Sequence, residues 1–180
     1  SLASHNVMGM LNRLSTFVAF VIGLGLVGYL HSHMKTHYWR GICLFPILII
    51  CGIIGFLPRS VHNYYIVPAI AFGLAMQNAS FSKIQGMAYN NVFTTGNLKN
   101  SVVAWSAYFF GEDKKQYNAA VNYMLLVVAF ALGAIVSAIC QRALGIRTIW
   151  LAIILLGTIN TIYLFKLRHI YTADKADVSK

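Results

Sequence analysis

Acidic residues are almost missing from this chain of 180 residues, which contains only Glu112, Asp113, Asp174 and Asp177. All four lie in polar segments outside the apolar runs. Proton relays, carboxylate-coupled ion transport and general acid–base catalysis inside a membrane depend on such groups at membrane depth. The chain also lacks a nucleophile elbow or any other local catalytic signature. We therefore identify no catalytic residue and expect that the chain is not an enzyme.

Cysteines are few as well, and none is placed for chemistry. Cys43, Cys51 and Cys140 lie inside apolar runs, at neither zinc spacing nor an exposed loop, and we interpret them as small packing residues. The first ten residues lack the basic and apolar regions of a signal peptide. There is no initiator Met either. We expect the chain to begin inside a longer protein.

Apolar residues make up 58% of the chain and charged residues only 10%, with a mean hydropathy of +0.67. An ordinary soluble domain has roughly 25% charged residues. A helix of about 20 apolar residues crosses about 30 Å of hydrocarbon, and a run as short as 101–111 is expected to be interfacial or re-entrant. We predict an all-α, polytopic helical membrane protein with five visible transmembrane helices, at residues 14–30, 41–57, 64–80, 119–140 and 148–165.

The net charge of +10 would suggest nucleic acid as a partner for a soluble chain. Here the basic residues flank apolar runs, as topology signals do, so we expect the lipid bilayer and no nucleic acid. Ten Lys and Arg fall on the side that holds the loop 31–40, the region 81–118 and the C-terminal tail. The other side holds four, Arg13, Arg59, Arg142 and Arg147. The positive-inside rule predicts a multi-pass protein of the cell (plasma) membrane with a cytoplasmic C-terminus.

An internal repeat relates the two halves of the chain. Residues 12–23 (NRLSTFVAFVIG) align without gaps on residues 122–133 (NYMLLVVAFALG), at an offset of 110. With the charge assignment, the two copies cross in opposite directions, which predicts a 3+3 inverted repeat, an architecture common among secondary transporters. The first repeat, 1–63, lacks its first helix and part of its polar segment, and the second, 64–180, carries the C-terminal tail. Coincidence among apolar residues is the alternative.

A polar stretch at residues 77–98 interrupts the apolar runs. Lipid-exposed irregular backbone is excluded in a bilayer, so this stretch is either a loop in water or the lining of a cavity. Amides, hydroxyls and unwound carbonyls can coordinate a cation or a neutral polar solute without any fixed charge. Our candidate binding residues are Gln77, Asn78, Asn90, Asn91, Thr94, Thr95, Gly96 and Asn97.

We predict that four of these candidates, Gln77, Asn78, Thr95 and Asn97, converge on one pocket. Gly96 between them is free to adopt a positive φ. The alternative is a cytoplasmic loop followed by an interfacial helix, with the Gln and Asn side chains capping helix ends.

Two other groups of polar residues have simpler interpretations. His31, His33 and His37 could ligate a metal, but a solvated loop without an acidic partner is the better interpretation, and we predict no metal and no cofactor. Thr158 and Asn160, with Thr161, could line a path or form hydrogen bonds between helices.

The segments Gly73-x3-Gln77-Asn78-Ala79 and Thr94-Thr95-Gly96-Asn97-Leu98 resemble the YoaK-like family of bacterial membrane proteins, a domain of unknown function. The resemblance covers the whole chain and is most specific at residues 69–98. Two departures are the missing first helix and the missing Thr-Gly-Asn of the first half, where this chain has Asn6-Val7-Met8-Gly9.

The resemblance implies an integral membrane protein, related to transport, without an established substrate. We accordingly expect a small transporter or permease for a polar solute or cation, with its site in the polar stretch. The alternative is a channel or scaffold subunit that assembles with itself or with another membrane protein. A glycine face on the first span would serve such assembly. A membrane enzyme is the third and least favoured function.

Overall fold

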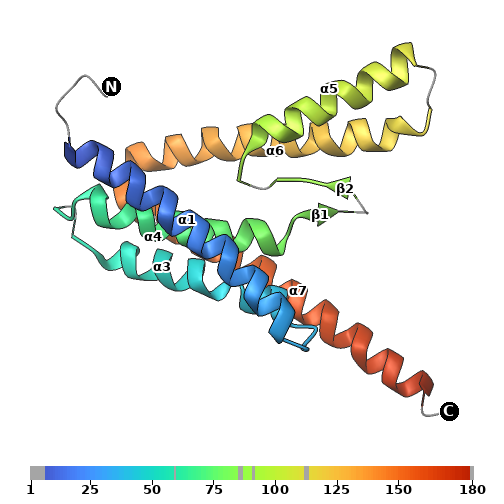
Figure 1. Cartoon of the computed structure of the whole chain (residues 1–180), viewed down its shortest axis with the longest axis horizontal. Helices are drawn as coiled ribbons and strands as arrows, with labels where there is room; N and C mark the ends of the chain where they lie inside the picture. The colour runs from blue at the N-terminus through green and yellow to red at the C-terminus, as the bar shows by residue number, and fades with distance from the viewer. Residues whose placement is uncertain (1–6, 59, 85–86, 91, 112–113, 179–180) are drawn as a thin grey trace. The chain divides into compact units, whose positions relative to one another are not determined.

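The computed structural model describes residues 7–58, 60–84, 87–90, 92–111 and 114–178. Helices dominate it (Figure 1). The elements are α1 (Val7–His33), α2 (Trp39–Ile42), α3 (Phe45–Phe56), α4 (Asn63–Ser80), β1 (Lys83–Ile84), β2 (Met87–Ala88), α5 (Thr94–Phe110), α6 (Gln116–Leu144), the 3-10 turn η1 (Gly145–Thr148) and α7 (Ile149–Val178). Four of the five predicted spans each lie largely on one helix, and the span at 41–57 is divided between α2 and α3. The prediction of an all-α membrane protein is confirmed.

Three helical stretches among the described residues are long and apolar enough to cross a membrane. They are Val7–His33, Trp39–Phe56 and Gln116–Thr172, the last of which includes α6 and most of α7. Helix α4 is outside this group because its 18 residues include Asn63, Pro68, Gln77 and Asn78. A helix with so many polar residues packs against protein rather than lipid on at least one face.

The chain divides into two compact units, residues 1–80 with 146–180, and residues 81–145. These units group helices by contact, whereas the repeats at 1–63 and 64–180 group them by sequence. The inverted repeat therefore stays a prediction.

In the first unit, α1 and α4 pack side by side and run in the same direction. A Cβ on Gly23 would lie 2.6 Å from the carbonyl oxygen of Phe72 and 2.9 Å from Cβ of Ala75. Further along both helices, Val27 and Met76 share a buried cluster. Because later residues of α1 contact later residues of α4, the pair is parallel. Gly23 is the position at which the two backbones approach most closely, as small residues allow in membranes.

Helix α3 runs against both α4 and α7. Cys43, just before α3, packs with Met76, whereas Ile47 packs on Gly73, one turn earlier in α4. A Cβ on Gly55 would similarly lie 2.7 Å from the Trp150 ring at the start of α7. Helices α1, α4 and α7 consequently share one direction, and α3 takes the opposite one.

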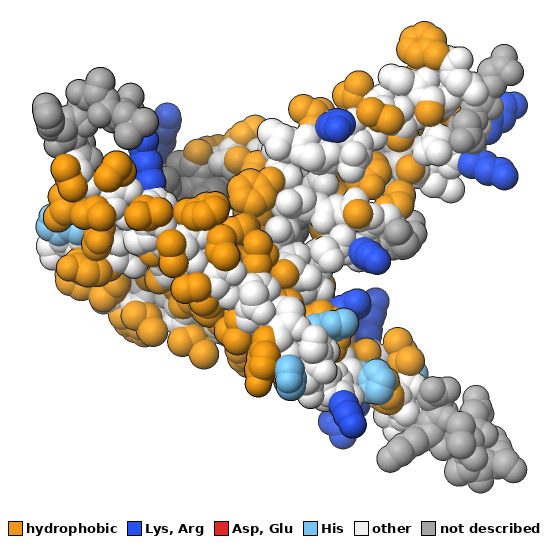
Figure 2. Space-filling view, in the orientation of Figure 1, with side chains coloured by type: hydrophobic (Ala, Val, Ile, Leu, Met, Phe, Trp, Pro, Cys, Tyr) orange, Lys and Arg blue, Asp and Glu red, His pale blue; other side chains and the backbone are white. Residues whose placement is uncertain are grey.

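Apolar side chains remain on the outside of these helices. Leu14, Phe17 and Ile22 of α1 are 57%, 66% and 57% exposed. On the face shown in Figure 2, hydrophobic side chains cover α1 along most of its length, and His, Lys and Arg side chains gather where it ends. A helix with an apolar outer face is suited to lipid contact.

The second unit is a helical hairpin, α5 and α6, preceded by a small β-hairpin. Strands β1 and β2 pair antiparallel, with Lys83 opposite Ala88. Helix α5 packs along α6, and the Ser101 hydroxyl donates to the carbonyl of Ala120 at 3.5 Å. The short run predicted at 101–111 is thus the second part of a longer helix.

Candidate functional site

The polar stretch is held together by a pair of asparagines. The backbone N–H of Asn90 donates to Oδ1 of Asn97 at 3.0 Å, and Nδ2 of Asn97 donates back to the carbonyl oxygen of Asn90. Asn97 is only 4% exposed. The side-chain amide of Asn97 thus pairs with both the N–H and the carbonyl of Asn90, which belongs to no helix or strand. Backbone groups in a buried loop require such partners.

The Asn90 side chain forms the turn that leads into α5. Its Oδ1 accepts from the backbone N–H groups of Val92 and Phe93, at 2.9 and 2.8 Å. Such a side chain substitutes for a backbone acceptor at the start of a helix. Helix α5 begins at Thr94, directly after Phe93.

The β-hairpin before this turn is fastened to α6. The hydroxyl of Tyr123 donates to the carbonyl oxygen of Ala88 at 2.7 Å, and the N–H of Tyr89 donates to the carbonyl of Ser82 at 3.0 Å. Burial raises the pKa of the Tyr89 phenol, which stays protonated at neutral pH. The hydrogen bonds from Tyr123 and Tyr89 are therefore made by uncharged groups.

The register of the helical hairpin places the start of α5 beside the middle of α6. Ser101 faces Ala120 in an antiparallel pair, so seven residues back, at Thr94, α5 is level with the region of Val127. That level is eleven residues into α6, about 16 Å from its first residue. Whether α5 is re-entrant or interfacial stays a prediction.

Two candidate side chains have buried polar atoms without a hydrogen-bond partner among the described residues. They are Oε1 of Gln77 and Oγ1 of Thr94. A buried polar group without a partner costs about 1–3 kcal/mol. Thr94, Thr95 and Gly96 are also the first three residues of α5. The first N–H groups of a helix have no intrahelical acceptor. The start of α5 thus presents both a hydroxyl oxygen and N–H donors to a polar group.

Gly96 does not use its freedom to adopt a positive φ. Gly96 is the third residue of α5, and Gly145 is the glycine with positive φ among the described residues. A Cβ at Gly96 would meet no heavy atom within 4 Å. Gly96 therefore opens a space beside the helix start instead of making a left-handed turn.

The structure describes the predicted site residues in two separate groups. Gln77 and Asn78 lie in the last turn of α4, in the first unit. The second unit holds Asn90, Thr94, Thr95, Gly96 and Asn97, of which Asn90 and Asn97 are joined and Thr95 is exposed. Asn91 lies outside the described residues. Convergence of the two groups on one pocket stays a prediction.

Sequence reasoning missed the aromatic and hydroxyl residues that position this stretch. Tyr123 and Ser101, one on each helix of the hairpin, make the contacts that fix it. Asn122-Tyr123 begins the segment that aligns on residues 12–23, but nothing in a single sequence shows that the tyrosine reaches back to Ala88. At the other end of the hairpin, Trp105 lies 6.0 Å from Tyr117 in an edge-on ring contact.

The other polar residues have structural roles. Asn160 is 4% exposed, and its Nδ2 donates to the carbonyl of Gly41 at 3.4 Å, which makes it a contact between helices. The hydroxyls of Thr158 and Thr161 donate within their own helix, to Ile154 and Gly157.

The three histidines of the predicted loop pack against different aromatic rings. His31 packs edge-on to Trp39, His33 stacks on Tyr29, and His37 lies against Tyr171. No group of three His, Cys, Asp or Glu that could hold a metal ion occurs among the described residues.

One family model covers most of the chain. It is described as "Protein of unknown function (DUF1275)" and matches residues 1–162. The chain belongs to the DUF1275 family. This match confirms the resemblance to the YoaK-like family, and every candidate residue lies within the matched range. The DUF1275 description names no activity, so the site's geometry must supply the function. No curated protein and no solved structure matches the chain.

Proposed function

We propose that this DUF1275 chain is a small membrane transporter or permease for a neutral polar solute or a cation. The observation that carries the proposal is the start of α5, where the buried Thr94 hydroxyl oxygen has no partner among the described residues and Gly96 leaves open space beside the helix. Discontinuous helices whose ends lie at membrane depth form the substrate sites of many transporters.

The polar groups at this site are all uncharged. The backbone of Asn90 and the side chain of Asn97 are hydrogen-bonded to each other and form a frame for the site. Within this unit, the unpaired Thr94 hydroxyl oxygen is then the atom available to a solute or a cation. Carbonyl and hydroxyl oxygens without a counter-charge suit a neutral polar solute or a weakly held cation.

The remainder of the proposal follows from charge. We place the chain in the cell membrane with its C-terminus in the cytoplasm, and we assign it no catalysis. Within the first unit, Lys35, Arg40, Lys166 and Arg168 lie toward the end where α1 finishes, and Arg13 and Arg147 lie toward the other. This asymmetry agrees in sign with the positive-inside rule.

A flux assay on reconstituted full-length protein tests the proposal. Glycerol and urea serve as neutral probes, followed by light scattering, and K⁺ is followed with an enclosed dye. We expect one class of probe to cross faster than in empty liposomes, and Thr94→Val to slow it without loss of folded protein. Rates equal to those of empty liposomes for all three probes would contradict transport.

The alternative of an assembly subunit has one observation in its favour. A Cβ on Gly25 or Gly28 of α1 would meet no heavy atom within 4 Å, whereas Gly23 is already occupied by α4. Two open glycines on one helix allow a second helix to approach closely. Mass measurement of the detergent-solubilised protein distinguishes the two functions. An oligomer that Gly28→Leu dissociates would support assembly.

A further inference from the structure

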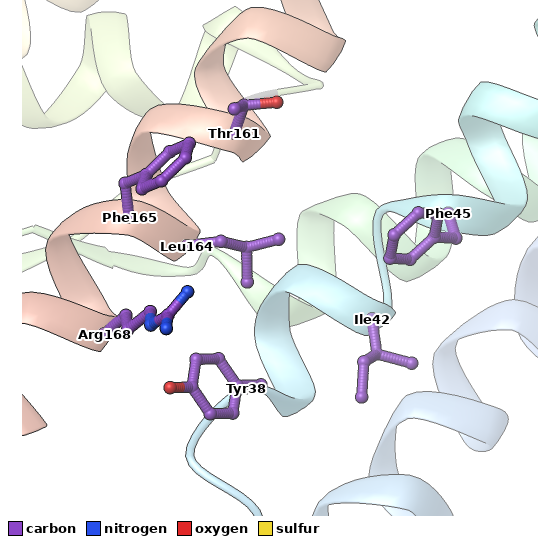
Figure 3. A pocket seen from close by; sticks show the side chains of 7 residues that line it. All are labelled: Tyr38, Ile42, Phe45, Thr161, Leu164, Phe165 and Arg168. Atoms are coloured by element: carbon purple, nitrogen blue, oxygen red, sulfur yellow. The ribbon is translucent and has the colours of Figure 1, made fainter.

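A groove between α7 and the chain from Tyr38 to Phe45 has one charged end and one apolar end (Figure 3). Its volume is about 440 Å³. Arg168 and Tyr38 lie together at one end, and Phe45 lies at the other. The hydroxyl of Thr161, another lining residue, is already donated to the carbonyl of Gly157 at 2.8 Å. The polar chemistry of the groove is thus concentrated at Arg168 and Tyr38.

Close packing beneath the groove fixes its shape. At Gly41 a Cβ would lie 2.6 Å from Cδ2 of Leu164 and 3.2 Å from Oδ1 of Asn160. The Asn160 side chain also donates to the Gly41 carbonyl. With α2 held against α7 at this point, Ile42 and Phe45 stay 39% and 47% exposed beside the contact.

Basic side chains surround the charged end. A second cavity of about 420 Å³ on the same loop is lined by His31, Lys35, His37 and Arg40, among others. No carboxylate belongs to the side chains described in this unit. The nearest acidic residue along α7 in sequence is Asp174, six residues beyond Arg168, or about 9 Å along the helix axis. This end therefore attracts anions.

A topology signal alone requires only basic residues in water at the ends of helices. Such a signal does not require an apolar groove that begins at an arginine. Along α7, Thr161 to Arg168 is seven residues, about 10 Å, so the groove runs from the charged interface toward the hydrocarbon region. A cation and a hydroxyl followed by apolar side chains match a phosphate ester followed by an acyl chain.

We propose that this groove binds one anionic glycerophospholipid, with its phosphate on the guanidinium of Arg168 and the hydroxyl of Tyr38. One acyl chain lies along Ile42, Phe45 and Leu164. Arginine binds phosphate through paired charge-assisted hydrogen bonds, and basic pockets between transmembrane helices on the cytoplasmic side are known to hold lipid head groups. Free phosphate shares the recognised chemistry but makes no use of the apolar end.

Titration of the delipidated full-length protein with phosphatidylglycerol tests this site, with native mass spectrometry counting bound lipids. We expect one lipid to bind, and Arg168→Gln to weaken it about tenfold, a factor that corresponds to about 1.4 kcal/mol. Arg142→Gln, an exposed arginine of α6, is the matched control and should change the affinity less than twofold. Ile42→Trp, which fills the apolar end, should weaken the lipid as Arg168→Gln does.

A comparison of three ligands, phosphatidylglycerol, phosphatidylcholine and inorganic phosphate, shows which chemistry the groove recognises. Phosphatidylcholine should bind at least tenfold more weakly than phosphatidylglycerol, and inorganic phosphate should displace the lipid poorly. Equal binding of the two lipids, an unaffected Arg168→Gln variant, or displacement by phosphate at the lipid's own concentration would each overturn the proposal. If Arg168→Gln fails to fold, Tyr38→Phe removes only the second phosphate contact and should weaken phosphatidylglycerol, whereas unchanged phosphatidylglycerol affinity in this variant would overturn the proposal.

Discussion

At the scale of single residues, Asn97 has the largest structural role in the polar stretch. It closes two hydrogen bonds with the backbone of Asn90 while buried on the first turn of α5. Thr95, two residues earlier, is exposed and carries none of this. The two positions therefore form a matched pair for mutation.

Asn97→Ala should lower the free energy of unfolding by about 1–3 kcal/mol, because it leaves the N–H and carbonyl of Asn90 without partners. Thr95→Ala is the control and should change it by less than about 0.5 kcal/mol. Chemical unfolding in mixed micelles, followed by circular dichroism, measures both. Equal, small effects would show that Asn97 is solvated and not a structural bridge.

Gly96→Ala should separate stability from function. The new methyl group enters open space, and alanine in place of glycine within a helix stabilises by about 0.5–1 kcal/mol. If a solute occupies that space, the flux of the transported probe should fall although the protein melts at a higher temperature. Gly25→Ala, which also faces open space on α1, should raise stability and leave the flux unchanged. A loss of flux in both variants would point to a general effect of rigidity.

At the scale of helices, the sequence patterns predicted where helices occur better than the residues at which they begin and end. Residues 94–97 contain two threonines, a glycine and an asparagine, types that favour turns and caps over helix interiors, so the sequence predicts a helix from 101. In the structure α5 starts at Thr94, because the Asn90 side chain supplies the turn that precedes it. A bond between residues seven apart leaves no periodic signal in one sequence.

The sequence also could not predict which residues of different helices contact one another. The glycines of α1 predict a face for close helix contact, but they do not show that Gly23 alone meets α4 while Gly25 and Gly28 stay open. Likewise Asn160 fits both a path and a contact between helices, and only its bond to Gly41 decides for the contact. The class of protein follows from hydropathy, whereas partners depend on tertiary packing.

Gly23→Val should destabilise the α1–α4 pair by about 1–3 kcal/mol, because the added side chain meets the Phe72 carbonyl and Ala75. Gly25→Val on the opposite side of α1 should cost much less. Thermal unfolding in detergent, read from intrinsic tryptophan fluorescence, compares the two variants. Equal melting temperatures would mean that α1 and α4 do not pack through Gly23.

At the scale of the whole molecule, the first unit allows a direct test of orientation. Lys35 follows α1, and Ser60 lies between α3 and α4, at the opposite end of the same helices; both are exposed.

In a background without native cysteines, an impermeant maleimide added to intact cells should label a cysteine at Ser60 and spare one at Lys35, as the positive-inside rule predicts. Labelling after lysis is the control and should modify both. The reverse pattern in intact cells would invert the topology and place the charged end of the lipid groove outside.

The parallel pairing of α1 and α4 has a consequence for biosynthesis. Gly23 and Phe72 are forty-nine residues apart, and ribosomes add about 5–20 residues each second. For about 2–10 s after Gly23 is made, α1 has no α4 to pack against, and its small-residue face lies open in the translocon or the bilayer. During that interval the nascent helix is a substrate for chaperones, for quality-control proteases and for wrong pairing with other helices. A mutation at Gly23 would lengthen that exposure, so reduced abundance in cells should accompany any loss of stability measured on the purified protein.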